Sequence, residues 1–168
     1  KELNLPLNKK IMIHVGRLDP WRGYENAIEL YTKLKSQGFE LIIAGAQKSD
    51  LGYEKVAISG AIFIEYLPRP ELMKYIRASD IFLCLSNIKS TIIFSGLGSS
   101  IMEASNLGVP ILSTTLVSFQ GSKEERRQLG LIPKVPIDID HAEKCVKYII
   151  KNPNRFSKGK EVAKKYYS

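Results

Sequence analysis

Two arginines, Arg17 and Arg22, stand in a loop at 16–23 that follows a short apolar run. A guanidinium donates several hydrogen bonds in a fixed fork that matches phosphate oxygens. The pair is therefore a candidate clamp for a diphosphate. Two ordinary surface arginines are an equally good interpretation, because the loop lacks the glycine pattern of a P-loop or of a dinucleotide-binding fingerprint.

A run of small residues leads into a helix-like segment and is a second candidate for anion binding. Small residues let a ligand approach the backbone, and the free N–H groups of a helix start favour negative charge. Glu103, about one turn further on, has a carboxylate that can accept hydrogen bonds from sugar hydroxyls. The alternatives are a capped, tight turn and an ordinary surface glutamate. The candidate residues of the loop are Ser95, Gly96, Leu97, Gly98, Ser99 and Ser100.

A third loop, 65–70, offers an aromatic ring and exposed backbone at Tyr66 and Leu67, which suit a nucleotide base or simply a turn. His14 lies inside an apolar run, so we expect a hydrogen-bonded core or rim residue without a catalytic role. No histidine has a partner at metal-ligand spacing, and no Ser/His/Asp order stands out. The sequence thus predicts neither a metal site nor a covalent triad.

Alternating strands and helices must position these loops. Apolar runs at 10–15, 40–44, 61–64, 80–85 and 109–113 predict buried strands, and a weaker edge strand is expected within 131–137, where two prolines intervene. Helical spacing is found at 23–37, 70–78, 98–106 and from 140 onward. This alternation predicts an α/β, Rossmann-like, doubly wound parallel sheet, whose ligands bind beyond the carboxyl ends of the strands.

The composition fits one ordinary domain of 168 residues, with 44% hydrophobic and 25% charged residues. No apolar run reaches the roughly 20 residues needed to span a bilayer, and no signal peptide is evident, so we expect a cytoplasmic protein. The net charge of +8 favours an anionic partner: nucleic acid, an anionic membrane surface or a phosphorylated small molecule. Cys84 and Cys145 are expected to be buried, reduced thiols.

Three segments resemble, in order, the signature segments of family 4 glycosyltransferases, which have the two-domain GT-B fold. They read HVGRLDPWRGYENAIELYTKL, FIEYLPRPELMKYIRASDIFLCLS and GLGSSIMEASNLGVPILST, and they span roughly 11–114. The resemblance implies a C-terminal, donor-binding half of a GT-B enzyme at 10–168. It also implies an interdomain-linker remnant at 1–9 and an N-terminal acceptor domain outside this chain.

The resemblance assigns roles to several candidate residues. Gly16 and Arg17 match a pair that binds the donor diphosphate, and Arg22 stands where lysine is usual. Glu103 matches the glutamate that contacts the donor ribose. With these roles assigned, we expect the Tyr66-Leu67 segment to hold the base. The chief departure is Ser95, because the family usually carries a first glutamate there. The segment 116–121 also lacks the usual Gly-Gly, which points to altered sugar specificity.

The resemblance thus implies transfer of a hexose from a UDP- or GDP-sugar to a hydroxyl acceptor of a polysaccharide, glycolipid or glycoprotein. Retention of anomeric configuration, no metal and no cofactor besides the donor are implied, with Arg17, Arg22 and Glu103 as catalytic residues. We expect the isolated domain to be inactive. Ser95 motivates an alternative, a nucleotide-binding or regulatory module without catalysis. The basic C-terminal helices leave open docking on an anionic membrane, with nucleic acid less favoured.

Overall fold

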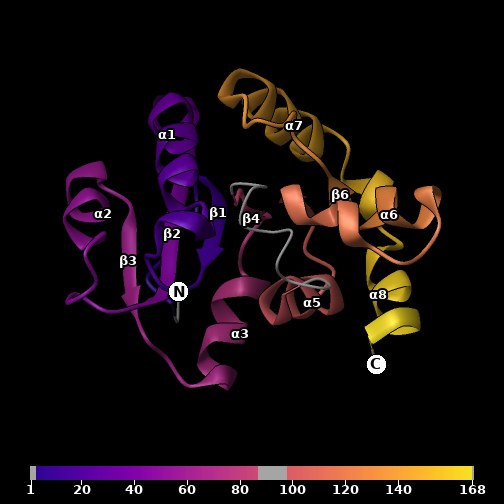
Figure 1. The fold of residues 1–168 in the computed structure, drawn as a ribbon, viewed down its shortest axis with the longest axis horizontal. Coiled ribbons are helices and arrows are strands. Elements are labelled where there is room, and N and C mark those ends of the chain that lie inside the picture. The colour runs from indigo at the N-terminus through magenta and orange to yellow at the C-terminus, as the bar shows by residue number, and fades with distance from the viewer. Residues whose placement is uncertain (1–2, 87–97, 168) are drawn as a thin grey trace.

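A six-stranded parallel sheet forms the centre of the computed structural model, which describes residues 3–86 and 98–167 (Figure 1). The strand order is β3-β2-β1-β4-β5-β6, the arrangement of a doubly wound Rossmann sheet, so the predicted fold class is confirmed. The strands are β1 Lys10–Val15, β2 Phe39–Ala46, β3 Ile62–Glu65, β4 Ile81–Cys84, β5 Ile111–Ser113 and β6 Gly130–Leu131.

Strand β1 shows why these apolar runs become strands. It pairs with β2 on one side and β4 on the other, with Met12 opposite Leu41 and Ile81. Successive side chains point to opposite faces of a sheet. Ile11 and Ile13 therefore enter one hydrophobic cluster and Met12 the other. The segment of β1 buried on both faces, Ile11 to Ile13, is apolar, and that is the pattern visible in the sequence.

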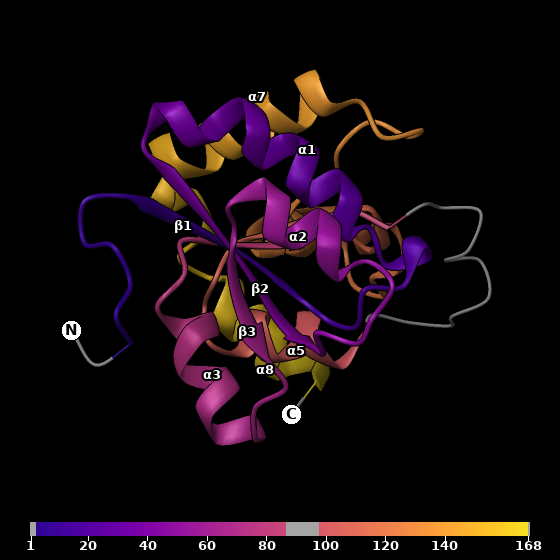
Figure 2. The same ribbon diagram turned by 90° about the vertical axis from the view of Figure 1, so that its left-hand side faces the viewer.

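Two layers of helices cover the two faces of the sheet (Figure 2). One layer holds α1 Tyr24–Leu34, α2 Tyr53–Ser59 and α7 Ile139–Lys151, whose apolar residues join the cluster around Met12. The opposite layer holds α3 Arg69–Arg77, α5 Ser99–Asn106 and α8 Gly159–Tyr167, with α6 Lys123–Leu129 packed on α8. Across the ranges 3–86 and 98–167, no helix is long and apolar enough to span a membrane.

The structure differs from the sequence prediction mainly at the β5–β6 edge. Strand β5 starts at Ile111 instead of 109, and β6 contains only Gly130 and Leu131. A Cβ at Gly130 would lie 1.8 Å from the carbonyl oxygen of Ile111, so only glycine permits this close pairing. Cys145 is buried as expected, whereas Cys84 is half-buried; both are free thiols.

Helix α6 begins with a capping box that also anchors α8. Glu125 Oε2 accepts hydrogen bonds from the Ser122 amide at 2.9 Å and the Tyr166 hydroxyl at 2.8 Å, and Lys165 Nζ lies 2.7 Å from Oε1. These contacts, led by the Lys165 hydrogen bond, lower the pKa of Glu125 from 4.5 to about 2. They stabilise the ionised carboxylate and tie the two helices together.

This shift predicts an acid-sensitive contribution to folding. A carboxyl group whose folded pKa is depressed stabilises the fold above its unfolded pKa of 4.5, and the contribution is lost as pH falls toward about 2. Chemical denaturation should therefore show Glu125→Gln to be less stable than the parent at pH 6, with the gap closing toward pH 2. Glu124→Gln, one position earlier on the same helix, is the matched control. A gap that stays constant across this range contradicts the assignment.

Candidate functional site

The candidate residues gather at the carboxyl edge of the sheet. The loop 16–23 follows β1, and α5 starts beyond the end of β4, the strand that pairs with β1. Chain crossovers run in opposite directions from these two strands, and doubly wound sheets bind ligands at such a switch point. Ser95, Gly96 and Leu97 lie outside the described residues, so the structure places only the later part of that loop, from Gly98.

Asp19 draws the two predicted arginines together. Its Oδ2 lies 3.3 Å from Arg17 Nη2 and 3.2 Å from Arg22 Nε. The Arg22 guanidinium also lies over the Trp21 ring, 4.4 Å from the centroid. Two guanidiniums and one carboxylate give the loop a local charge of about +1. Each guanidinium has five N–H donors, so the pair has donors beyond those directed at Asp19 with which to bind an anion. Sequence reasoning missed Asp19, although an acidic residue between two arginines is a usable signal.

Two glycines shape this loop. Gly16 has φ +147, and a Cβ there would meet Arg22 Cδ at 3.4 Å, so the Arg22 stem lies against the Gly16 backbone. Gly23 has φ +81 and packs against the backbone of Leu85, just beyond β4. Asn26 Nδ2 then donates to the Leu85 carbonyl at 2.7 Å. The start of α1, and with it Arg22, is thereby fixed to the end of β4.

The start of α5 has no side-chain cap among the described residues. Gly98 is its N-cap in an extended conformation and supplies no side-chain cap, and its carbonyl accepts from the Ile101 and Met102 amides. The first N–H groups of a helix have no partner inside the helix. The amides of Ser99 and Ser100 occupy those positions here. Amides at these positions are the groups to which an anion binds at a helix start.

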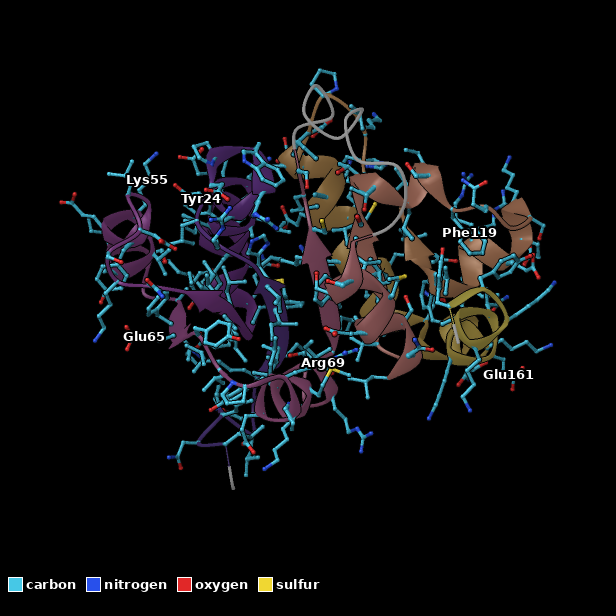
Figure 3. The ribbon with its side chains drawn as sticks, turned by 60° about the horizontal axis from the view of Figure 1, so that its bottom comes forward. Tyr24, Lys55, Glu65, Arg69, Phe119 and Glu161 are labelled. Carbon is cyan, nitrogen blue, oxygen red and sulfur yellow. The ribbon has the colours of Figure 1, made fainter. Side chains whose placement is uncertain are left out.

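Glu103 lies one turn into α5 and meets a residue that sequence reasoning did not single out. Its side chain is only 14% exposed, and Oε1 is 2.7 Å from Nε of Arg69. Arg69, labelled in Figure 3, is the first residue of α3, and α3 packs beside α5. No sequence signal links these two residues, because they are far apart in the chain and meet only through packing.

The Tyr66 loop lies further along the same edge. The Tyr66 amide donates to the Ala46 carbonyl at 3.1 Å, which extends the β2–β3 ladder by one bond. Its side chain is 73% exposed, while Leu67 is half-buried. Strand β2 stands between β3 and β1, so the structure places this loop two strands away from the arginines. An exposed ring at this distance suits a base better than a phosphate.

His14 departs from the expectation of a hydrogen-bonded residue. It is 2% exposed, and neither ring nitrogen has a hydrogen-bond partner within the described chain. Burial lowers the pKa of His14 from 6.5 to about 4; the nearby Leu83 backbone opposes this shift, and the positive charge of Arg22 adds a smaller lowering. The imidazole is therefore neutral at physiological pH and lies beneath the arginine loop.

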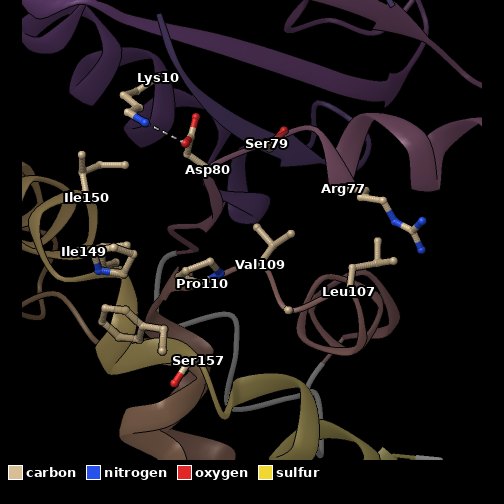
Figure 4. A pocket seen from close by; sticks show the side chains of 13 residues that line it. Lys10, Arg77, Ser79, Asp80, Leu107, Val109, Pro110, Ile149, Ile150 and Ser157 are labelled. Atoms are coloured by element: carbon tan, nitrogen blue, oxygen red, sulfur yellow. Dashed lines mark hydrogen bonds and ion pairs between the residues drawn. The ribbon is translucent and has the colours of Figure 1, made fainter.

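A separate hollow lies at the opposite edge of the sheet (Figure 4). It has a volume of about 370 Å³, and its lining includes Lys10 at the start of β1, with Asp80 just before β4 and Pro110 just before β5. Lys10 Nζ lies 3.3 Å from Asp80 Oδ1 across its rim. Because it opens at the amino ends of the strands, this hollow is not part of the candidate site.

Comparison with known protein families shows the family of the chain. Residues 1–166 match the model of the family described as "Glycosyl transferases group 1". The chain belongs to this family. A relative, trehalose synthase of Pyrococcus horikoshii, is 28% identical over 162 residues, which cover 86% of this chain and 36% of the relative. The chain thus spans about a third of the length of that curated relative.

Solved structures with the same fold confirm the GT-B assignment of the domain. The C-terminal domain of a glycosyl transferase group 1 family protein (LpcC) from Francisella tularensis superposes with a TM-score of 0.67 at 19% identity, covering 95% of this chain and 87% of that one. Anabaena Alr3699/HepE in complex with UDP-glucose gives a TM-score of 0.73 at 16% identity, covering 96% and 45%. At 16–19% sequence identity, these similarities show a shared fold and nothing more.

Proposed function

We propose that this chain binds a nucleoside-diphosphate sugar and serves as the donor half of a retaining hexosyltransferase. The observation that carries the proposal is the Arg17–Asp19–Arg22 cluster at the switch-point edge, the same edge at which α5 starts at Ser99. Family membership supports a transferase, and the fold is that of a protein solved with UDP-glucose.

The chemistry follows from charge that develops on the leaving group. When the bond between sugar and diphosphate breaks, negative charge grows on the phosphate oxygens. Donors already fixed around those oxygens stabilise the charge without reorganising. Arg17, Arg22 and the α5 N-terminus would supply this stabilisation, in place of the metal ion that other transferases use. Arg22 keeps the usual positive charge but offers a planar fork where the family has a compact ammonium.

The remaining candidates would position the donor. Glu103 would accept from the ribose hydroxyls, Tyr66 and Leu67 would hold a uracil or guanine base, and the backbone at Gly98 would approach the sugar-phosphate. Each of these is a binding role that lowers the entropic cost of reaction. The hydroxyl acceptor would be bound by a further domain, as expected if the chain is part of a protein as long as its relatives.

Removing the two arginines should weaken diphosphate binding tenfold or more, because charge-assisted hydrogen bonds are the strong ones. Isothermal titration of the parent chain and of Arg17→Ala/Arg22→Ala with UDP, GDP and their glucose conjugates tests this. Lys158→Ala/Lys164→Ala removes the same charge from exposed positions near and on α8 and is the matched control. Equal affinity of the parent and the arginine variant would refute the clamp.

Ser95 favours one other candidate function, a module that binds nucleotide without catalysis. A serine cannot supply the negative charge that the family's first glutamate places near the transferred sugar. The two functions share the binding result and differ in turnover. Sugar transfer or donor hydrolysis by the full-length protein, abolished by Arg17→Ala/Arg22→Ala, supports the enzyme. Tight nucleotide binding with no turnover over a panel of donors supports the module.

A further inference from the structure

The ion pair between Arg69 and Glu103 connects two helices that both start at the site edge. Arg69 opens α3, three residues after Tyr66, and Glu103 lies about one turn into α5. The two helices lie side by side on one face of the sheet (Figure 1). The contact therefore spans the gap between the loop proposed to hold the base and the helix proposed to meet the ribose.

The two side chains of the ion pair are buried to different extents, and this difference shows which of them the contact stabilises. Glu103 is 14% exposed and Arg69 is 75% exposed. A largely buried carboxylate loses hydration, and a cation with hydrogen bonds compensates this loss. The exposed guanidinium loses little hydration when it supplies them. The ion pair therefore stabilises the Glu103 side chain more than it stabilises the Arg69 side chain.

The backbone around Arg69 is stiff. Pro68 and Pro70 flank it, and each proline ring fixes its own φ. The Pro68 carbonyl accepts from the Glu71 amide at 3.0 Å and the Leu72 amide at 3.1 Å, which closes the first turn of α3. A side chain that starts from a fixed backbone loses less freedom when it forms a contact, so the guanidinium is well placed to hold a partner in one orientation.

We propose that Arg69 is a positioning residue, which fixes the Glu103 carboxylate so that it can accept hydrogen bonds from the ribose of a bound nucleotide. The inference rests on the proposed function, which supplies the nucleotide. Arg69 Nε engages Oε1, and a carboxylate has about four lone-pair sites, so Oε2 keeps its capacity for hydroxyl donors. Arg69 itself touches no reacting atom.

The test measures whether Arg69 affects the ribose contact alone. Each variant is titrated with UDP and 2′,3′-dideoxy-UDP, and with GDP and 2′,3′-dideoxy-GDP. The ratio of the two dissociation constants in each pair gives the contribution of the ribose hydroxyls to binding. In the parent chain UDP should bind more tightly than its dideoxy analogue. In Arg69→Met this preference should fall about tenfold, because a charge-assisted acceptor is no longer oriented. Binding of the dideoxy analogue should change by less than about twofold, since it lacks the hydroxyls. Arg69→Lys should restore part of the preference.

Arg77→Met, at the far end of α3, is the matched control and should leave both affinities unchanged. In Glu103→Gln the preference should already be weak, and adding Arg69→Met should change it no further. An unchanged UDP preference in Arg69→Met overturns the proposal while leaving the proposed function intact. Equal weakening of UDP and its dideoxy analogue also overturns it, since this is the result of a merely structural ion pair. Failure of the parent chain to bind either nucleotide overturns the proposed function itself.

Discussion

Replacing Gly23 by alanine is expected to destabilise the fold by about 4 kcal/mol or more, since backbone strain and overpacking act at one position. Gly23 has φ +81, in the region that favours glycine. A Cβ there would lie 2.2 Å from both the carbonyl carbon and the oxygen of Leu85. Those are backbone atoms next to the central strand β4, so they cannot turn aside as a flexible side chain would.

The same change is expected to disturb the site. The Leu85 carbonyl accepts from Asn26 Nδ2 at 2.7 Å, and any separation of Gly23 from Leu85 lengthens this bond. Arg22 directly precedes Gly23 in the chain, so its guanidinium would move relative to Asp19. Variant protein that still folds should therefore bind UDP more weakly than the parent. A loss of both stability and UDP binding would show that the contact between Gly23 and Leu85 supports both the fold and the site.

Gly38→Ala is the control that separates strain from overpacking. Gly38 has φ +83, but nothing lies within 4 Å of the place that a Cβ would occupy. It should cost about 1 kcal/mol, the penalty of left-handed backbone alone. Urea denaturation monitored by circular dichroism gives both values. Equal losses for the two variants would show that the β4 contact at Gly23 relaxes, and would contradict the overpacking argument.

The strands buried on both faces were the elements best predicted from sequence. The run at 10–15 coincides with β1, because a central parallel strand is buried on both faces and is therefore mostly apolar. Helix α2 had no assignment, and it buries one residue, Val56, so its amphipathic signal is weak. The edge strand β6 is two residues long and is set by a close approach at Gly130, which leaves no hydrophobic pattern to detect.

Only those site residues that lie close together in the sequence could be predicted from it. Arg17 and Arg22 share one short loop, so their type and spacing indicated a common anion. Asp19 was visible in that loop but was overlooked as the group that joins them. Arg69 could not be predicted, because its contact with Glu103 depends on how α3 packs against α5. Contacts between residues far apart in the chain can be found only in a structure. The fold class and the positions of the loops follow from the hydrophobic periodicity of the sequence.

His14 predicts a second large effect, on the stability of the fold in acid. Its pKa lies at about 4 in the folded chain, mainly through burial, against 6.5 when exposed. Between these two pH values the unfolded chain binds the extra proton and the folded chain does not, so stability falls as pH falls. At 1.36 kcal/mol for each pKa unit, the fold should lose roughly 3 kcal/mol as pH drops from above 6.5 to below 4.

His14→Leu should remove this loss and, at pH 8, leave the fold as stable as the parent or more so. Replacing an unpartnered buried polar group by an apolar one of similar size removes a desolvation cost of about 1–3 kcal/mol. His14→Gln is the matched control, since it does not titrate but still buries polar atoms. It should lack the acid-dependent loss yet be less stable than His14→Leu at every pH.

The window from pH 6.5 to 4.5 isolates His14, because the depressed pKa of Glu125 adds its own loss only below that range. Urea midpoints measured through this window should fall for the parent and stay level for both His14 variants. Parallel slopes in all three proteins would mean that the imidazole gains a hydrogen-bond partner in solution that keeps its pKa near 6.5. In that event a bound water or a neighbouring group, and not the apolar core, would control the ring beneath Arg22.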